Sequence, residues 1–488
     1  MAQHDPVPKR WLARRKESRM HFTSPEALAE VQRQLAHAVI RRVVDEVGVA
    51  ESFAVVVDET ADVAGREHMV ICLRFVTEAL TVRETSIGLY QADSTTAAAL
   101  FGLIQDALTR LQLPMDRIRG QCYDGAANMA GAFRGVQARV KAVEPRAVFV
   151  HCTAHRLNLV CQEALNGVRE VRDAIQEVGR LASFYRDSPK RMVALEHAGA
   201  QMSLRPLCPT RWTCSEACLT SVVKQYGPLV TSLDKLADDA KVRPEVSATA
   251  SGFGKTLRDF EFFFGLRVAL LLLQVTTPAM RTMQGQSQSV SANLGVARAV
   301  RDVVLSQRDR FERLWAELTS DAERLGVGCP RLRRPFRPPR RLDGGSEPHQ
   351  HACPKGRYRQ VYCEAVDWLA GSISGRFDSD EPTLATAEKA LLTAKEDALV
   401  ATATFYNLDL ERLRLHCQML VDVASSQRKA PLTSLDDVVA LLSDEGLRQV
   451  LPAATSLLRL VLTAPATSCA AERAFSLLRR LRDGCALP

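Results

Sequence analysis

Two aspartates come directly after apolar runs that are typical of buried strands. The run FAVVV (53–57) is mostly β-branched and suits a strand covered on both faces, and Asp58 follows it. The run from Arg117 to Tyr123 also reads as a strand, and Asp124 follows it. Burying an aspartate at the end of a core strand is costly unless a partner, such as a metal ion, neutralises it. The alternative for Asp58 is a carboxylate that caps a turn.

Strand-end carboxylates of this kind, with a third from a helix, are the ligand set of a two-metal phosphoryl-transfer site. Two Mg²⁺ ions about 3.5–4 Å apart hold the attacking and leaving oxygens of a phosphodiester in line. Magnesium prefers hard oxygen ligands, which carboxylates supply. Asp58 and Asp124 would lie at the same end of adjacent strands, so the spacing permits such a site.

The elements around these aspartates predict one α/β layer. Apolar periodicity and turn residues indicate three strands, then a helix, a strand, a helix, a strand and a helix. A further helix precedes them, from Pro25 to about Val47. The expected elements are strands over 53–58, 69–76, 80–90, 117–123 and 147–152, and helices over 93–111 (capped by Asp93-Ser94-Thr95), 125–143 and 154–165. The order describes a mixed five-stranded sheet, three strands antiparallel and two joined in parallel by helical crossovers.

The rest of the chain has a helical pattern. Residues 168–330 and 355–463 are rich in Leu, Ala, Val, Glu and Arg, and an Arg/Pro/Gly-rich segment (331–354) that cannot bury a core lies between them. This segment is expected to be an exposed or disordered loop that contacts phosphates, acts as a nuclear-import signal or is merely solvated. The segment Ser468 to Asp483 is an amphipathic helix that must pack on the α/β layer or on another subunit.

Bulk composition is that of an ordinary soluble protein. The chain has 488 residues, enough for two or three domains, with 64 basic and 56 acidic residues and a net charge of +8 that permits a nucleic-acid partner. Thirteen scattered cysteines fit free thiols in a reducing compartment. The polar, basic N-terminus is no signal peptide, and the longest apolar run, Val268 to Leu273, is too short for a membrane span.

Five motifs together resemble the hAT-family DNA transposases and their domesticated relatives, with zinc-finger MYM-type proteins nearest. They are DETAD (58–62), GQCYDGAANMAG (120–131), VHCTAHRLNLV (150–160), TRW (210–212) and SCAAERAFSLLRRL (468–481). The resemblance implies an α/β RNase H-like core interrupted by a large all-α insertion, in a nuclear protein.

The resemblance also implies roles for single residues. Asp58, Asp124 and Glu472 would be the catalytic carboxylates that bind two Mg²⁺ or Mn²⁺ ions. His155, in a CxxH word with Cys152, would lie near the DNA phosphate, and Arg211 and Trp212 match an RW word whose tryptophan stacks on a flipped base. The basic loop residues Arg333 and Arg334 are further candidate DNA contacts.

Several of these motifs have simpler readings. Cys152 and His155 could form half of a zinc site, but no second pair has suitable spacing. Trp212 could be ordinary core packing. The word GFGKT (252–256) fails as a phosphate loop because Thr249 stands where its first glycine belongs.

The family pattern also includes an N-terminal BED- or TTF-type zinc finger and a longer C-terminal dimerisation region than this sequence shows. We therefore expect a sequence truncated at both ends, whose self-association through the C-terminal helix is weakened. The expected organisation is a flexible basic segment (1–25), the first part of the core (26–166), an all-helical insertion (167–463) with a disordered loop (331–354), and the returning helix with a truncated dimerisation region (464–488).

The predicted ancestral function is Mg²⁺-dependent DNA strand cleavage and transfer. The alternative is a catalytically inactive, domesticated or decayed transposase that acts as a DNA- or chromatin-associated dimerising protein. A helical scaffold without any nucleic-acid role is the third hypothesis, disfavoured by the basic loop and the motif set. DNA is thus the expected partner, either transposon ends or chromatin.

Overall fold

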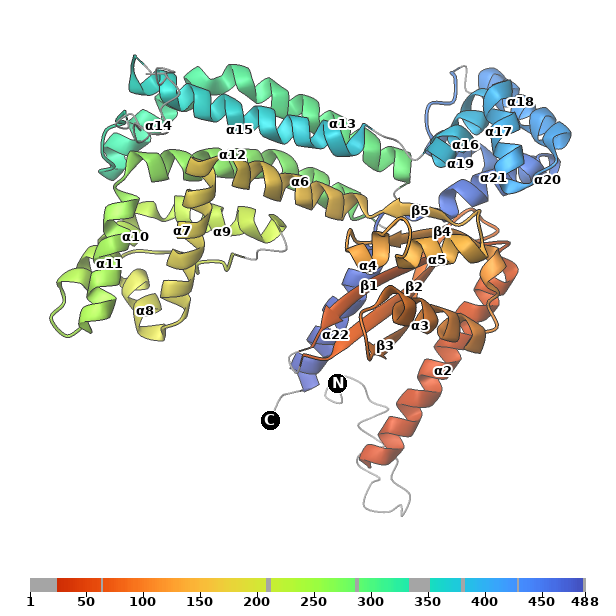
Figure 1. Cartoon of the computed structure of the whole chain (residues 1–488), viewed down its shortest axis with the longest axis horizontal. Coiled ribbons are helices and arrows are strands. Elements are labelled where there is room, and N and C mark those ends of the chain that lie inside the picture. The colour runs from red at the N-terminus through yellow and green to blue at the C-terminus, as the bar shows by residue number, and fades with distance from the viewer. Residues whose placement is uncertain are drawn as a thin grey trace, which may run out of the picture.

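The N-terminal half of the chain is built around a mixed five-stranded sheet, with strand order β3-β2-β1-β4-β5. The computed structural model describes residues 24–62, 65–207, 212–285, 289–332, 352–378, 382–427 and 430–485. The strands are β1 (Phe53–Ala61), β2 (Glu67–Val76), β3 (Val82–Ala92), β4 (Ile118–Tyr123) and β5 (Val148–His151). The pairs β1–β2 and β2–β3 are antiparallel, and β1–β4 and β4–β5 are parallel. The predicted arrangement of three antiparallel and two parallel strands is confirmed (Figure 1).

Strand β1 is longer than the sequence suggested. Its first five residues are buried, but the strand continues to Ala61 because Asp58 and the residues after it pair with β2, from Asp58 opposite Val70 to Ala61 opposite Glu67. Asp58 therefore lies inside a strand, and the alternative of a turn cap is wrong. On the other side, the parallel pairing with β4 reaches Val56 opposite Cys122. Asp58 and Asp124 come two residues after these two partners, at equivalent positions of β1 and of the segment that follows β4.

The helices beside the sheet also differ in detail from expectation. They are α2 (Pro25–Val49), α3 (Ala97–Arg110), α4 (Ala127–Ala130), α5 (Val136–Val143) and α6 (Thr153–Gly167), with a short 3-10 turn at Met115–Arg117. Helix α3 is capped by the side chain of Thr96, which accepts from the Ala99 backbone at 3.4 Å, not by residues 93–95.

The single helix expected over residues 125–143 is wrong, because a turn separates α4 from α5. The Gly135 N–H donates to the Gly131 carbonyl at 3.0 Å, and a Cβ at Gly135 would lie 2.5 Å from the Gly131 nitrogen. Only glycine fits so close a backbone approach. The turn therefore has a defined shape, and it carries Phe133 and Arg134 at its tip.

The two faces of the sheet are covered differently. Val55 and Val57 belong to a core cluster with residues of α3, α5 and the end of α2. Val56 faces the other way and shares its cluster with Ala464, Cys469 and Ala471. Because side chains alternate along a strand, Asp58 points to the same face as Val56, which is the face that the C-terminal segment covers.

A large helical region interrupts the core between α6 and the last helix, as predicted (Figure 1). Its first part contains α7 (Arg169–Arg186), α8 (Pro189–His197), α9 (Trp212–Lys224), α10 (Tyr226–Asp238), α11 (Pro244–Leu257), α12 (Phe260–Met283), α13 (Val290–Ser306), a 3-10 turn (Gln307–Arg310), α14 (Phe311–Leu325) and α15 (Pro354–Phe377). Its second part contains α16 (Pro382–Thr393), α17 (Glu396–Tyr406), α18 (Leu410–Gln427), α19 (Leu435–Leu442), α20 (Glu445–Val450) and α21 (Pro452–Thr463). The chain then returns to the sheet as α22 (Cys469–Cys485).

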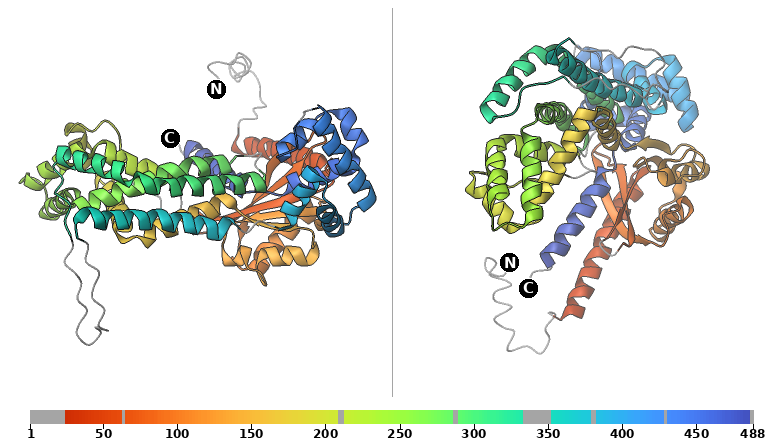
Figure 2. Two further views of the ribbon diagram at one scale, coloured as in Figure 1. Left: turned by 90° about the horizontal axis from the view of Figure 1, so that it is seen from above. Right: turned by 60° about the vertical axis from the view of Figure 1, so that its left-hand side comes forward.

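The long helices of the first part run away from the sheet (Figure 2). Helix α12 lies at the centre of this part, in contact with α6, α7, α9 and α13. The helix has 24 residues, and an 18-residue window within it has a mean hydropathy of 1.6, which would suffice to cross a membrane. However, 72% of that window is buried inside the protein. It is accordingly the core helix of the insertion. The second part has a separate core, which also takes in Val76 and Leu80 of the sheet region.

Two predicted flexible segments cannot be compared with the structure. Most of the N-terminal basic segment (residues 1–23) and most of the Arg/Pro loop (residues 333–351) lie outside the described residues.

Candidate active site

Hydrogen bonds and close packing hold the segment between α21 and α22, which leads from the helical region back to the sheet. Thr153 donates to the Ala466 carbonyl from its backbone N–H at 3.0 Å and from its hydroxyl at 2.9 Å. Gly120 of β4 lies under the same segment, and a Cβ there would be only 2.8 Å from Cδ of Pro465. Since this segment passes directly over β4, the start of α22 is positioned beside the carboxyl ends of β1 and β4.

Three buried thiols meet where α22 begins. They belong to Cys122 of β4, Cys152 after β5 and Cys469 of α22. The Ser468 backbone N–H donates to the sulfur of Cys152 at 3.2 Å. Hydrogen bonds from the Cys122 and Cys469 thiols hold the pKa of Cys152 well below its usual range. The sulfur of Cys152 therefore joins the returning segment to the sheet.

Asp58 lies in an acidic environment that the other two predicted carboxylates create. Burial raises the pKa of Asp58 to about 8, and the negative charges of Glu472 and Asp124 add to this shift. Asp58 accepts a hydrogen bond from the Glu59 backbone at 3.1 Å, and Asp124 accepts one from the Ala126 backbone, also at 3.1 Å. The structure thus brings both Glu472 and Asp124 within electrostatic reach of Asp58, which lies on a strand that α22 contacts.

In this structure the three carboxylates are not arranged as the ligands of a single metal ion. Within the described ranges, no group of three His, Cys, Asp or Glu side chains is arranged so that it could hold one metal ion. The donor set nevertheless suits a hard cation, because mutually repelling carboxylates in a half-buried site are stabilised by a positive charge.

A buried ion network fixes the position of α22. Arg74 of β2 donates to Glu84 of β3 at 2.8 Å, with side chains only 1% and 5% exposed. Arg473, which follows Glu472, donates to the other oxygen of Glu84 at 2.8 Å and to the Gln284 carbonyl at 3.1 Å. Arg74 also donates to the Leu462 carbonyl at 3.1 Å. The network connects the sheet, the end of α12, the end of α21 and α22.

Glu84→Gln should therefore destabilise the protein and release α22. The substitution keeps the shape but removes the charge of Glu84 from beside the buried Arg74 guanidinium, and breaking a comparable buried pair costs about 3–5 kcal/mol. The free energy of unfolding, measured with urea, checks this. Glu411→Gln on α18 is a matched control, because its side chain is 81% exposed, and it should change stability by less than about 0.5 kcal/mol. Equal effects of the two substitutions would contradict a structural role for the network.

His151 is a site residue that the sequence analysis missed, because it stands just before the CxxH word that Cys152 and His155 form. It ends β5 next to Asp124, and its Nε2 atom is buried without a hydrogen-bond partner. Burial lowers the pKa of His151 to about 4. A Cβ at Gly125 would lie 2.8 Å from that Nε2, so the glycine after Asp124 leaves room for the ring. His155 is half-buried, and its ring centroid lies 6.0 Å from that of His151.

Glu59 and Asn128 were also missed. The Asn128 amide donates to Glu59 at 3.2 Å and to the Thr95 carbonyl at 3.0 Å, which fastens α4 to the end of β1. The sequence held a signal for this pair, since Glu59 lies in DETAD and Asn128 in the motif that contains Asp124.

Most of the other predicted DNA contacts cannot be placed. Arg211, Arg333 and Arg334 lie outside the described residues, and Trp212 is described only as the first residue of α9.

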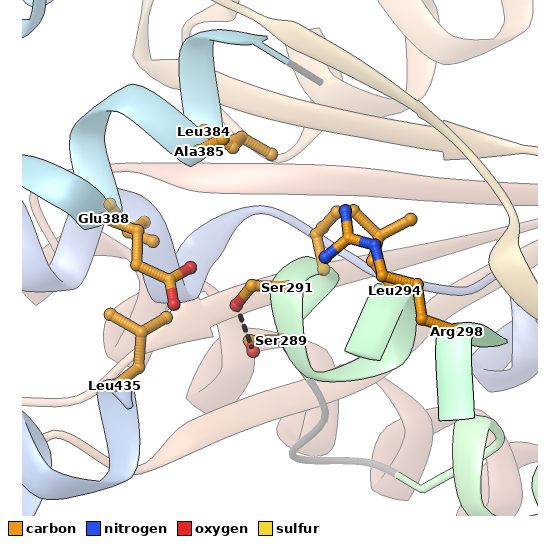
Figure 3. A pocket seen from close by; sticks show the side chains of 10 residues that line it. Ser289, Ser291, Leu294, Arg298, Leu384, Ala385, Glu388 and Leu435 are labelled. Atoms are coloured by element: carbon orange, nitrogen blue, oxygen red, sulfur yellow. Dashed lines mark hydrogen bonds between the residues drawn. The ribbon is translucent and has the colours of Figure 1, made fainter. Parts of the chain in front are cut away.

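A pocket between α13, α16 and α19 lies elsewhere, in the helical region (Figure 3). Ser289, Ser291, Arg298 and Glu388 are among its lining residues. Its volume of about 60 Å³ suffices for only a few water molecules. None of its lining residues belongs to the acidic cluster, so the pocket is a separate feature, and its volume is too small for a nucleotide.

Comparison with known proteins places the first part of the chain among RNase-like domains. Residues 1–135 match the family DUF4371, described as "ZMYM1/FAM200, RNase-like domain". A human protein called "52 kDa repressor of the inhibitor of the protein kinase" is 25% identical over an alignment of 299 residues, and the alignment covers 58% of this chain and 39% of that protein. Its mouse counterpart is 26% identical over 303 residues, with the same shares. The chain thus spans less than half the length of these relatives, and the RNase-like fold of its core agrees with the family match.

Proposed function

We propose that the chain is an hAT-transposase-like nuclear protein whose acidic cluster derives from a DNA-cleaving site that depends on Mg²⁺ or Mn²⁺. The observation that carries this proposal is a convergence of three carboxylates. The β1–β4 pairing puts Asp58 and Asp124 at equivalent positions, and the segment that bonds to Thr153 brings α22 and Glu472 within electrostatic reach of Asp58. These residues stand far apart in the chain, and each lies in one of the motifs that resemble transposases.

Asp58, Asp124 and Glu472 would hold two divalent cations. Cations bound there would lower the pKa of a water molecule and neutralise charge on the phosphodiester. The role of the chain is to supply negative charge from rigid elements. Asp58 comes from the centre of a paired strand, Asp124 from a strand end fixed by the Ala126 N–H, and Glu472 from a helix held by Arg473. The water would attack the phosphorus of one DNA strand and break its bond to the 3′-oxygen, which leaves as a 3′-hydroxyl. That hydroxyl would then attack a second phosphodiester and displace the 3′-oxygen bonded there.

The experiment that tests catalysis is nicking of supercoiled DNA by the purified protein and by Asp124→Asn, in Mg²⁺ and in Mn²⁺. A second candidate function is a catalytically inactive, DNA- or chromatin-associated protein. The name of the two relatives, which calls them repressors, favours it. The two candidates share DNA binding and differ in cleavage.

Phe133 is a further candidate DNA contact near the acidic cluster. Its side chain is 95% exposed at the tip of the Gly131–Gly135 turn, beside the exposed Arg134. The turn follows α4, which Asn128 fastens to Glu59 at the end of β1. A rigid turn that presents an aromatic ring to solvent next to a cation is suited to stacking on an unpaired base.

Phe133→Ala should weaken binding of single-stranded DNA by about 5- to 150-fold, which corresponds to the 1–3 kcal/mol of one stacked base. Fluorescence anisotropy with a labelled oligonucleotide measures the affinity at several salt concentrations. Phe133→Tyr keeps the ring and should bind nearly as the original protein does. If Phe133→Ala binds as tightly as Phe133→Tyr at every salt concentration, the ring does not contribute to binding and Phe133 is not part of the interface. Affinity that still falls with salt would then be due to phosphate contacts.

A further inference from the structure

Buried hydrogen bonds connect the end of α12 to the segment that leads into α22. The side-chain amide of Asn293, in the first turn of α13, donates to the Met283 carbonyl at 3.3 Å and to the Thr153 hydroxyl at 2.8 Å. The Thr153 hydroxyl in turn donates to the Ala466 carbonyl at 2.9 Å. Helices α6, α12 and α13, which carry the first three of these residues, contact one another (Figure 1). These four residues form a hydrogen-bond path from the helical insertion to α22.

The chemistry of the groups fixes the direction of each bond in the path. A backbone carbonyl only accepts, so the Asn293 atom beside Met283 must be the amide nitrogen, and the Thr153 hydroxyl must donate to Ala466. The hydroxyl oxygen can accept from Asn293 at the same time. Within the described residues, Oδ1 of the fully buried Asn293 has no hydrogen-bond partner. An apolar side chain of the same size would avoid that cost, so packing alone does not account for an asparagine here.

A second contact connects the same end of α12 to α22. Arg473 donates to the carbonyl of Gln284, the residue that follows Met283. Glu472 lies between the two connected positions, Ala466 and Arg473. A shift of the end of α12 would therefore move the segment on both sides of Glu472.

We propose that Asn293 is a positioning residue, through which the helical insertion sets the place of Glu472 beside the sheet. Helix α12 is the core helix of the insertion, so the position of its end follows from the packing of the insertion as a whole. Hydrogen-bond networks between rigid elements can carry such coupling. The inference rests on the proposed function where it concerns a metal-binding carboxylate, but the path itself can be tested without metal or DNA.

Hydrogen exchange of the full chain, read by mass spectrometry of peptides, measures how firmly the start of α22 is held. Asn293→Leu keeps the size of the side chain and removes the amide. The amides of residues 468–476 should then exchange about fivefold faster, the effect of one hydrogen bond on a local opening equilibrium. Thr153→Val should have at least this effect, whereas Thr153→Ser keeps the hydroxyl and should stay within about twofold of the original protein.

Tyr226→Phe is the matched control. The Tyr226 hydroxyl donates to the Leu257 carbonyl at 2.7 Å, which is a buried hydrogen bond elsewhere in the insertion. Its loss should leave exchange at residues 468–476 unchanged. In every variant the amides of β2 should exchange as slowly as in the original protein, which shows that the core remains folded.

A double variant tests whether Asn293 acts through Thr153. Asn293→Leu should add almost nothing to the effect of Thr153→Val, because the path is already broken there. Additive effects of the two substitutions would overturn the inference. So would unchanged exchange at residues 468–476 in Asn293→Leu, or an equal change in Tyr226→Phe.

Metal affinity distinguishes this inference from the proposed function. Titration calorimetry with MnCl2 should show that Asn293→Leu weakens Mn²⁺ binding about tenfold, the lower end of the effect of losing a group that orients a metal ligand. Tyr226→Phe should bind Mn²⁺ as the original protein does. Equal Mn²⁺ affinity in Asn293→Leu and the original protein would overturn the positioning role. An original protein that binds no Mn²⁺ would contradict the proposed metal site, while the exchange experiment still decides whether the path holds α22.

Discussion

Asp124→Asn is expected to abolish metal-dependent nicking of DNA while the protein remains folded. The substitution removes one negative charge from the cluster that surrounds Asp58 and keeps the shape of the side chain. Loss of a partner one step removed from a metal ion typically costs 10- to 100-fold in metal affinity or activity, so loss of a direct ligand should cost at least about 100-fold. The measurement is the rate at which supercoiled plasmid becomes open circles in Mg²⁺ or Mn²⁺.

The matched control is Asp93→Asn. Asp93 is an exposed aspartate just after the end of β3, so its substitution tests the loss of an acidic side chain outside the cluster. It should nick DNA at the original rate. Equal nicking by the Asp124→Asn variant and the original protein, or no nicking by either, would remove the enzymatic proposal and leave the DNA-associated candidate.

The strands of the core could be predicted because burial on both faces has a local signature. Runs such as FAVVV are continuous, apolar and β-branched, and the structure has strands there. The end of β1 could not be predicted in the same way. Its last residues, Asp58 to Ala61, are held by pairing with β2, which local composition does not report. The helix break at Gly131–Gly135 had a visible signal, two glycines four residues apart, that helical periodicity on either side outweighed.

The acidic cluster depends on information that the pattern of residues alone does not contain. Glu472 reaches Asp58 only because Ala466 bonds to Thr153 and Arg473 bonds to Glu84, contacts between segments that the whole helical region separates. A resemblance between motifs pointed to Glu472; periodicity indicated only an amphipathic helix. The same limit applies to α2, whose inner apolar residues Val43 and Val47 are buried while Leu35 and Val39 further out are exposed. Amphipathicity shows which face is apolar but not what covers it.

Asp58→Asn should stabilise the protein above about pH 8 and have little effect below pH 4. The pKa of Asp58 is raised from 3.8 to about 8 in the folded state, mainly by burial. Between these two values the unfolded chain has released the proton while the folded chain still holds it, so the stability contributed by this carboxyl falls as pH rises. Asparagine carries no such penalty. The difference in unfolding free energy between the two proteins should grow through this window to on the order of a few kcal/mol.

Divalent cations should reverse that difference. A cation bound by Asp58, Asp124 and Glu472 favours the ionised carboxylates, so Mg²⁺ or Mn²⁺ should raise the unfolding free energy of the original protein, and more at pH 8 than at pH 5. At a concentration 100 times the dissociation constant the gain is about 2.7 kcal/mol. Urea unfolding with and without the metal measures it, and Asp58→Asn should lose most of the gain. Stabilisation of the same size in both proteins would show that the cation binds elsewhere. A pH profile that Asp58→Asn does not alter would show that Asp58 is not the carboxyl whose proton is retained on folding.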